Sequence, residues 1–252
     1  MSSTEYFELP GAIGTLRGVI HHGSSGPQVV VLHGYFSSNK IGPYRLYFEL
    51  AEALSRRGAT VVRVDLSGMG ESDGRIEDVR YEHHVLDFEL VREALRVTSS
   101  SDDLHVVAHC AGCHIPLSAE RPDDLRSLTL VAPFAGGERG FGGTMFTMAQ
   151  WDELRATGST LRKGWYCHRS FFDSNDVLQR PLSATLRKKT HVILAGKDEL
   201  TPLAESERWA EAQQVRHTSV PTADHNFTTR AAREQLFDLV ARTVFRASGT
   251  AV

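Results

Sequence analysis

Short apolar runs alternate with longer amphipathic segments along most of this chain. The runs at 28–34, 59–65 and 104–110 are nearly continuous in apolar residues, as in strands that are buried on both faces of a sheet. Between them, residues 43–58 and 81–98 repeat their apolar positions at helical spacing. The same alternation predicts further strands at 15–22, 125–134, 190–199 and 215–221, and further helices that begin at 111, 203 and 229.

This order of strands and helices predicts an α/β fold with a doubly wound, mostly parallel sheet. In such sheets, ligands bind outside the carboxyl ends of the strands, where the connecting loops meet. Functional residues are therefore expected in the loops that follow the predicted strands.

The alternation is interrupted by residues 136–187, which show no clear strand pattern and contain many aromatic side chains. A long insertion at the ligand-binding edge of a sheet is more often a lid than a linker, although its aromatic residues would also form a small core. We therefore predict a core made of residues 1–135 and 188–246, a lid at 136–187 and a disordered tail at 247–252.

Charge and composition argue against several partners. The formal net charge is −3, so nothing here attracts nucleic acid or an anionic membrane. The chain has no apolar run of about 18 residues, and its polar first residues lead us to expect no secretory signal. We expect a cytoplasmic protein. The chain has three cysteines, an odd number, which fits a compartment where structural disulfides are rare. The basic run Arg-Lys-Lys at 187–189 is interpreted as a solvated turn.

The stretch Cys-Ala-Gly-Cys-His at 110–114 is compatible with several chemistries. It matches the attachment pattern of c-type haem, it contains a redox pattern, and with His109 it suggests zinc. Covalent haem is normally attached outside the cytosol, and no second pair of ligands stands at zinc spacing. A fourth interpretation makes Cys110 a nucleophile on a tight turn between strand and helix, with no metal and no cofactor.

Reactive residue types follow three of the predicted strands. Cys110 comes after the strand at 104, Asp198 after the strand at 190, and His225 after the last short strand. Ala108 and Gly112 stand two residues before and two residues after Cys110, and small residues there let a strand and a helix approach closely. The three side chains are therefore expected to meet at one edge of the sheet.

Taken together, these features resemble the α/β-hydrolase family over nearly the whole chain, from about residue 15 to residue 246. The resemblance is carried by His33-Gly34, by DLSGMGESDG at 65–74, by the turn at 108–112, and by GKDELTP with ADHNF. The first two are most similar to the serine aminopeptidase-like and feruloyl-esterase-like branch. The family places its catalytic residues in the chain order nucleophile, acid, histidine.

The resemblance implies a role for each of these residues. Cys110 would be the nucleophile, His225 its base, and Asp198 the acid that orients the imidazole. Backbone N–H groups of Tyr35 and Ala111 would form the oxyanion hole. A helix start and a nearby imidazole both favour the thiolate form, so we expect a thiolate–imidazolium pair. The residues expected to bind substrate are Phe36, His109, Trp151, Trp165 and Phe227.

Cysteine stands where this family usually has serine, and the difference restricts the chemistry. Thiolate leaves more easily than alkoxide, so an adduct with an alkyl ester would collapse back to substrate, whereas thioesters, enol lactones and aryl esters avoid this. The family's cysteine members include dienelactone hydrolases and acyl-CoA:amino acid N-acyltransferases, which use activated acyl donors.

The predicted function is cleavage of a thioester or activated ester, as in a thioesterase or esterase, through an acyl-cysteine. The substrate would be a small acyl compound, carried on coenzyme A or a carrier protein. Two alternatives remain open from the sequence. One is an acyltransferase that passes the acyl group to an amine or alcohol, and the other is a non-catalytic ligand-binding member of the fold.

Overall fold

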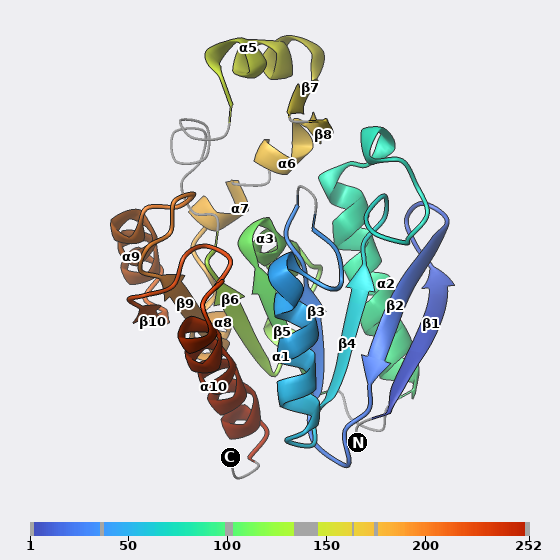
Figure 1. Cartoon of the computed structure of the whole chain (residues 1–252), viewed down its shortest axis with the longest axis vertical. Coiled ribbons are helices and arrows are strands. Elements are labelled where there is room, and N and C mark those ends of the chain that lie inside the picture. The colour runs from blue at the N-terminus through green and yellow to red at the C-terminus, as the bar shows by residue number, and fades with distance from the viewer. Residues whose placement is uncertain are drawn as a thin grey trace.

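The computed structural model describes residues 3–35, 38–98, 103–133, 146–162, 164–173 and 176–249. Its main feature is a sheet with the strand order β1-β2-β4-β3-β5-β6-β9-β10 (Figure 1). The strands are β1 (Thr4–Pro10), β2 (Thr15–His21), β3 (Gln28–Leu32), β4 (Thr60–Asp65), β5 (Leu104–His109), β6 (Ser127–Val131), β9 (Thr190–Ala195) and β10 (Arg216–Val220).

The sheet is parallel from β4 to β10, and only β1 and β2 at its edge run antiparallel to their neighbours. This bears out the predicted α/β class with a mostly parallel sheet. Because strands β3, β5, β6, β9 and β10 point the same way, the loops that follow them meet at a single edge.

Helices cover both faces of the sheet, and the side chains of each strand alternate between them. Val30 and Leu32 pack with residues of α2 (Tyr81–Thr98), whereas Val29 and Val31 pack with α1 (Leu46–Ser55) and α10 (Arg230–Ala247). Burial on both faces explains why these strands read as continuous apolar runs rather than as alternating ones. The remaining helices of the core are α3 (His114–Leu117), α8 (Ala184–Lys189) and α9 (Leu203–Ala212).

Within the stretch that joins β6 to β9, the described elements α5 (Met148–Thr157), β7 (Ser159–Arg162), β8 (Trp165–His168) and α6 (Ser170–Asp173) stand beyond the carboxyl ends of the strands, at the top of Figure 1. Phe146, Trp151 and Phe172 pack edge to face within it, with centroid distances of 5.2–5.3 Å. In the same stretch, β7 and β8 form an antiparallel hairpin, and α7 (Asp176–Gln179) follows α6.

Three local predictions differ from the structure. The edge strand is β1, because Thr4–Pro10 pairs with β2, whereas the first strand that the sequence predicts is the one at 15–22. The inserted segment contains the hairpin β7–β8, whose four-residue strands are too short to show a pattern. The helix predicted from 111 is only a 3₁₀ turn at Cys110–Cys113 followed by the single turn of α3.

Candidate active site

Cys110 occupies a sharp turn at the end of β5. Its φ angle is +55°, a left-handed conformation that a side-chain-bearing residue adopts only when its surroundings enforce it. The turn is possible because Gly112 lies against the backbone of β3, where a Cβ atom would come within 2.3 Å of the His33 carbonyl oxygen. Ala108, on the other side of the turn, is fully buried in the core. The small residues therefore act as the sequence predicted.

The loop after β3 passes directly over the cysteine. A Cβ atom on Gly34 would lie 3.1 Å from the Cβ atom and 3.6 Å from the sulfur of Cys110. The neighbouring residue, Tyr35, stacks on Phe171 of α6 with 3.7 Å between ring centroids, and its hydroxyl donates to the Tyr166 carbonyl at 3.1 Å. Packing against the inserted segment thus holds the loop that runs beside the cysteine.

His225 and Asp198 meet at the same edge, from the loops after β10 and β9. The Nδ1 atom of His225 lies 2.8 Å from Oδ2 of Asp198, and both side chains are less than a tenth exposed. The second carboxylate oxygen accepts from the backbone N–H groups of Leu200 and Thr201, at 2.8 and 2.9 Å. The carboxylate is fixed by these bonds and therefore sets the orientation of the imidazole.

The electrostatic environment keeps His225 protonated. Burial by itself lowers the pKa of this imidazole, but the charge of Cys110 and the hydrogen bond to Asp198 outweigh burial and raise it to about 10. Within the described residues, the buried Nε2 atom has no hydrogen-bond partner of normal geometry. Cys110 therefore acts on this imidazole through its charge.

A buried hydrogen-bond chain joins the three loops behind the site. The Gly34 N–H donates to the Tyr47 hydroxyl at 3.4 Å, and that hydroxyl lies 2.8 Å from Nδ1 of His109. The Nε2 atom of His109 lies 2.9 Å from the backbone carbonyl of His225. Because a carbonyl only accepts, Nε2 carries the proton and Nδ1 accepts from the tyrosine. Burial and nearby His225 lower the pKa of His109 to about 3, which keeps it neutral.

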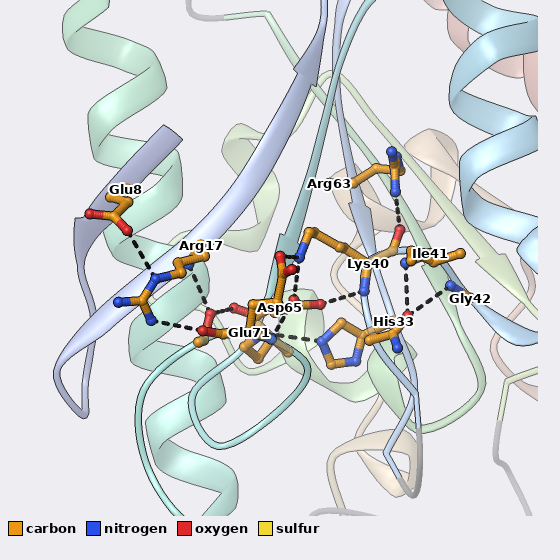
Figure 2. Close-up of polar contacts among 12 residues, drawn as sticks. Glu8, Arg17, His33, Lys40, Ile41, Gly42, Arg63, Asp65 and Glu71 are labelled. Carbon is orange, nitrogen blue, oxygen red and sulfur yellow. Dashed lines mark hydrogen bonds and ion pairs between the residues drawn. The ribbon is translucent and has the colours of Figure 1, made fainter. Parts of the chain in front are cut away.

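A second network anchors the continuation of the Gly34 loop to β4 (Figure 2). Asp65 accepts from the Lys40 backbone N–H at 2.6 Å and from its ammonium group at 2.5 Å. The Lys40 ammonium also pairs with Glu71, and Arg63 donates to the Lys40 carbonyl. Burial lowers the pKa of Lys40, but the two carboxylates hold it above its usual value. In this way Asp65 and Glu71 of the stretch DLSGMGESDG support the loop.

The right-hand part of Cys-Ala-Gly-Cys-His belongs to the core. Cys113 and His114 are fully buried, and the sulfur of Cys113 points to the Ala108 carbonyl at 3.2 Å. Burial raises the pKa of the Cys113 thiol well above its usual value. Cys110, Cys113 and Cys167 are free thiols. Across the described ranges, no three His, Cys, Asp or Glu side chains are placed to share a metal ion.

Two of the five residues that are expected to bind substrate are enclosed by the protein itself. Phe227 is fully buried in the core beneath α10, and both ring nitrogens of His109 already bond within the protein. Each therefore shapes the site from behind. Trp151 lies in the small core of the inserted segment, and Trp165 on β8 is 40% exposed. Phe36 lies outside the described residues.

Tyr47 is the functional candidate that the sequence reasoning missed. It lies on the apolar stripe of the predicted helix, between Leu46 and Leu50, and was therefore not distinguished from the core residues. A tyrosine on a buried stripe usually needs a hydrogen-bond partner for its hydroxyl. That requirement is the one signal by which the sequence could have indicated a polar contact there.

A parallel sheet with a strained cysteine turn after β5 and a His–Asp pair after β9 and β10 has the layout of a hydrolase of the α/β class. The sequence profile described as the alpha/beta hydrolase family matches residues 29–246. The chain therefore belongs to the α/β hydrolase family. No curated protein sequence matches the chain significantly.

Several solved structures share the fold at low sequence identity. Est1E from Butyrivibrio proteoclasticus, solved with ferulic acid, aligns with a TM-score of 0.77 and 16% identity over 94% of this chain and 96% of its own. Alpha/beta hydrolase domain-containing protein 10 from mouse aligns with a TM-score of 0.74 and 18% identity, over 97% of this chain and 99% of its own. A putative hydrolase from Agrobacterium vitis S4 aligns with a TM-score of 0.76 and 15% identity, over 96% of this chain and 99% of its own. At these identities the likeness concerns the fold.

Proposed function

We propose that this protein cleaves thioesters or activated esters through an acyl–Cys110 intermediate. The observation that carries the proposal is the His225–Asp198 contact of 2.8 Å, together with the charge interaction between His225 and Cys110 on its strained turn. A protonated imidazole beside a cysteine is the electrostatic partner of a thiolate, which is the nucleophilic form of the side chain.

The steps follow from these positions. The Cys110 thiolate attacks the carbonyl carbon, and the C=O bond becomes an oxyanion that accepts hydrogen bonds from the backbone N–H groups of Tyr35 and Ala111. The oxyanion collapses, the bond to the leaving group breaks, and the imidazolium of His225 donates its proton to the departing thiolate or aryloxide. His225, now neutral, takes a proton from water, and the resulting hydroxide attacks the acyl–cysteine and releases the acid and the thiolate.

Three points define the substrate class that we propose. The thiolate favours donors whose leaving group departs at least as easily as a thiolate, such as thioesters and aryl esters. The aromatic residues of the segment at 136–187, which we propose as a lid, suit an apolar acyl group. Est1E, the relative by fold, was solved with ferulic acid, an aromatic acid, and this supports ester-type substrates here.

The setting of the reaction is also proposed. The substrate would be a small acyl compound on coenzyme A or a carrier protein in the cytoplasm. None of the helices in the described part of the chain is long and apolar enough to cross a membrane.

Intact-mass spectrometry after incubation with acyl thioesters and aryl esters tests the proposal. We expect the wild-type protein to gain the mass of one acyl group, mapped to Cys110, and then to lose it. Cys110→Ala should show neither adduct nor turnover, while the matched control Cys167→Ala should behave like the wild type. Full turnover by Cys110→Ala on every active substrate would overturn the proposal. Loss of the adduct only when an amine or alcohol is added would favour transfer over hydrolysis.

A further inference from the structure

Five cationic side chains meet in a pocket at the end of the sheet opposite to Cys110. The pocket has a volume of about 450 Å³ and lies at the amino ends of β6, β9 and β10. We call it the basic pocket, and no acidic side chain is among its described lining residues. Its cations are Arg126, Lys188, Lys189, Arg216 and Arg246.

Among the described residues, three of the five cationic side chains have no polar partner. Within the part of the chain that the structure describes, the side chains of Lys188, Arg216 and Arg246 form no hydrogen bond or ion pair. Arg126 donates to the Ala247 carbonyl at 2.6 Å and lies 4.0 Å from an Asp103 oxygen, and Lys189 donates to a backbone carbonyl at 2.7 Å. This concentration of positive charge stands on a protein whose formal net charge is −3.

Helix ends account for part of this charge but not for all of it. Lys188 and Lys189 lie in the last turn of α8, and Arg246 lies in the last turn of α10, where cations offset the negative end of the helix dipole. Arg216, however, is the first residue of β10, and Arg126 precedes β6. Neither belongs to a helix, so the dipole does not explain why all five converge.

The floor of the basic pocket is rigid and uncharged. His191 is buried, and its two ring nitrogens lie 2.7 and 2.9 Å from the hydroxyl oxygens of Thr243 and Thr218. Burial and the nearby Arg216 lower the pKa of His191 to about 4, so the ring is neutral at physiological pH. The concavity is therefore formed before any ligand arrives, which reduces the entropy cost of binding.

We propose that the basic pocket binds a compact polyanion, such as the phosphate groups of an organic phosphate. Concavity favours a compact ligand over an extended acidic surface, and several converging cations favour a multiply charged group. The six residues of β9 separate the pocket from the Asp198 loop, a span of about 20 Å. The ligand therefore does not touch the reacting atoms, and the proposal is independent of the enzymatic function proposed above.

Isothermal titration calorimetry with inorganic pyrophosphate, at constant ionic strength set with NaCl, tests the proposal. We expect one equivalent to bind to the wild-type protein. The double variant Arg216→Gln/Arg246→Gln should bind roughly tenfold more weakly, because each exposed ion pair contributes up to about 1 kcal/mol. The matched control is Arg242→Gln, an exposed arginine one helical turn before Arg246 that does not line the pocket. It should bind within about twofold of the wild type.

A second titration separates ligand classes. Citrate carries similar charge on carboxylates, and we expect it to bind more weakly than pyrophosphate if phosphate groups are preferred. Absence of pyrophosphate binding to the wild type, or equal affinity in the double variant, would overturn the proposal. Tight binding of a DNA duplex without binding of pyrophosphate would also overturn it, in favour of an extended polyanion. Circular dichroism of each variant confirms that the fold is intact.

Discussion

The charge interaction between Cys110 and His225 is tested most directly by removing the thiol. In the wild-type protein, burial opposes protonation of His225, while the Cys110 charge and Asp198 raise the pKa of the ring to about 10. Cys110→Ala removes the charge of Cys110 and leaves burial and the Asp198 contact unchanged. The pKa of His225 should therefore fall.

The size of the effect follows from the same quantities. The difference between the ordinary value of 6.5 and about 10 corresponds to roughly 5 kcal/mol in favour of the protonated ring. An opposite charge at close range typically changes a pKa by roughly 1–3 pH units. We expect a decrease of that order in Cys110→Ala, so that the ring loses its proton at a lower pH than in the wild type.

Nuclear magnetic resonance of ¹⁵N-labelled imidazole rings, followed from neutral to alkaline pH, measures this directly. The wild-type His225 signal should remain that of an imidazolium through neutral pH, and His109 should be neutral throughout because its pKa is lowered to about 3. Cys113→Ala is the matched control, since Cys113 is not among the groups that act on His225. An unchanged pKa of His225 in Cys110→Ala would refute the thiolate–imidazolium pair.

Three further substitutions probe the surroundings of the site. Tyr47→Phe leaves the buried Nδ1 atom of His109 without a donor and should cost about 1–3 kcal/mol in the free energy of unfolding. A lowered acylation rate with an unchanged KM would show that Tyr47 helps to position the site. Gly34→Ala places a Cβ atom 3.1 Å from that of Cys110 and should slow acylation roughly 10- to 100-fold with little loss of stability. Lys40→Met removes the partner of two carboxylates and should cost about 3–5 kcal/mol in urea denaturation.

Each of these outcomes has a clear opposite. Wild-type stability and rate in Tyr47→Phe would show that the hydrogen-bond chain behind the site carries no energy. A Gly34→Ala protein as fast as the wild type would mean that the loop is free to move away from the cysteine. For Lys40→Met, Glu71→Gln is the matched comparison, because that carboxylate is largely exposed and its loss should change stability by less than about 1 kcal/mol.

Most of the core sheet could be read from the sequence because burial on both faces leaves a continuous apolar run. Residues 28–34 and 104–110 are examples, and both contain strands of the parallel sheet. The edge strand Thr4–Pro10 was not predicted, since most of its side chains are exposed and the run is not apolar. The pairing of that strand with β2 depends on long-range contacts that no local pattern records.

The candidate catalytic residues were predictable for a similar reason. Cys110, Asp198 and His225 follow strands that run in the same direction, so the topology alone predicts that they share one edge. The residues expected to bind substrate were harder to predict, because an aromatic residue gives the same sequence pattern on a pocket wall and in a core. Phe227 turned out to be fully buried, and only its packing beneath α10 reveals this.

By itself, therefore, the sequence determined the fold class, the order of the elements and the turn that carries the cysteine, because local patterns of burial and of small residues encode them. Only the tertiary structure decided which polar side chains meet. The Tyr47–His109 contact spans 62 residues, and the five cations of the basic pocket come from two helices, one strand and the residue that precedes another strand. Such convergence depends on how separate elements pack together, and no single stretch of the chain contains that information.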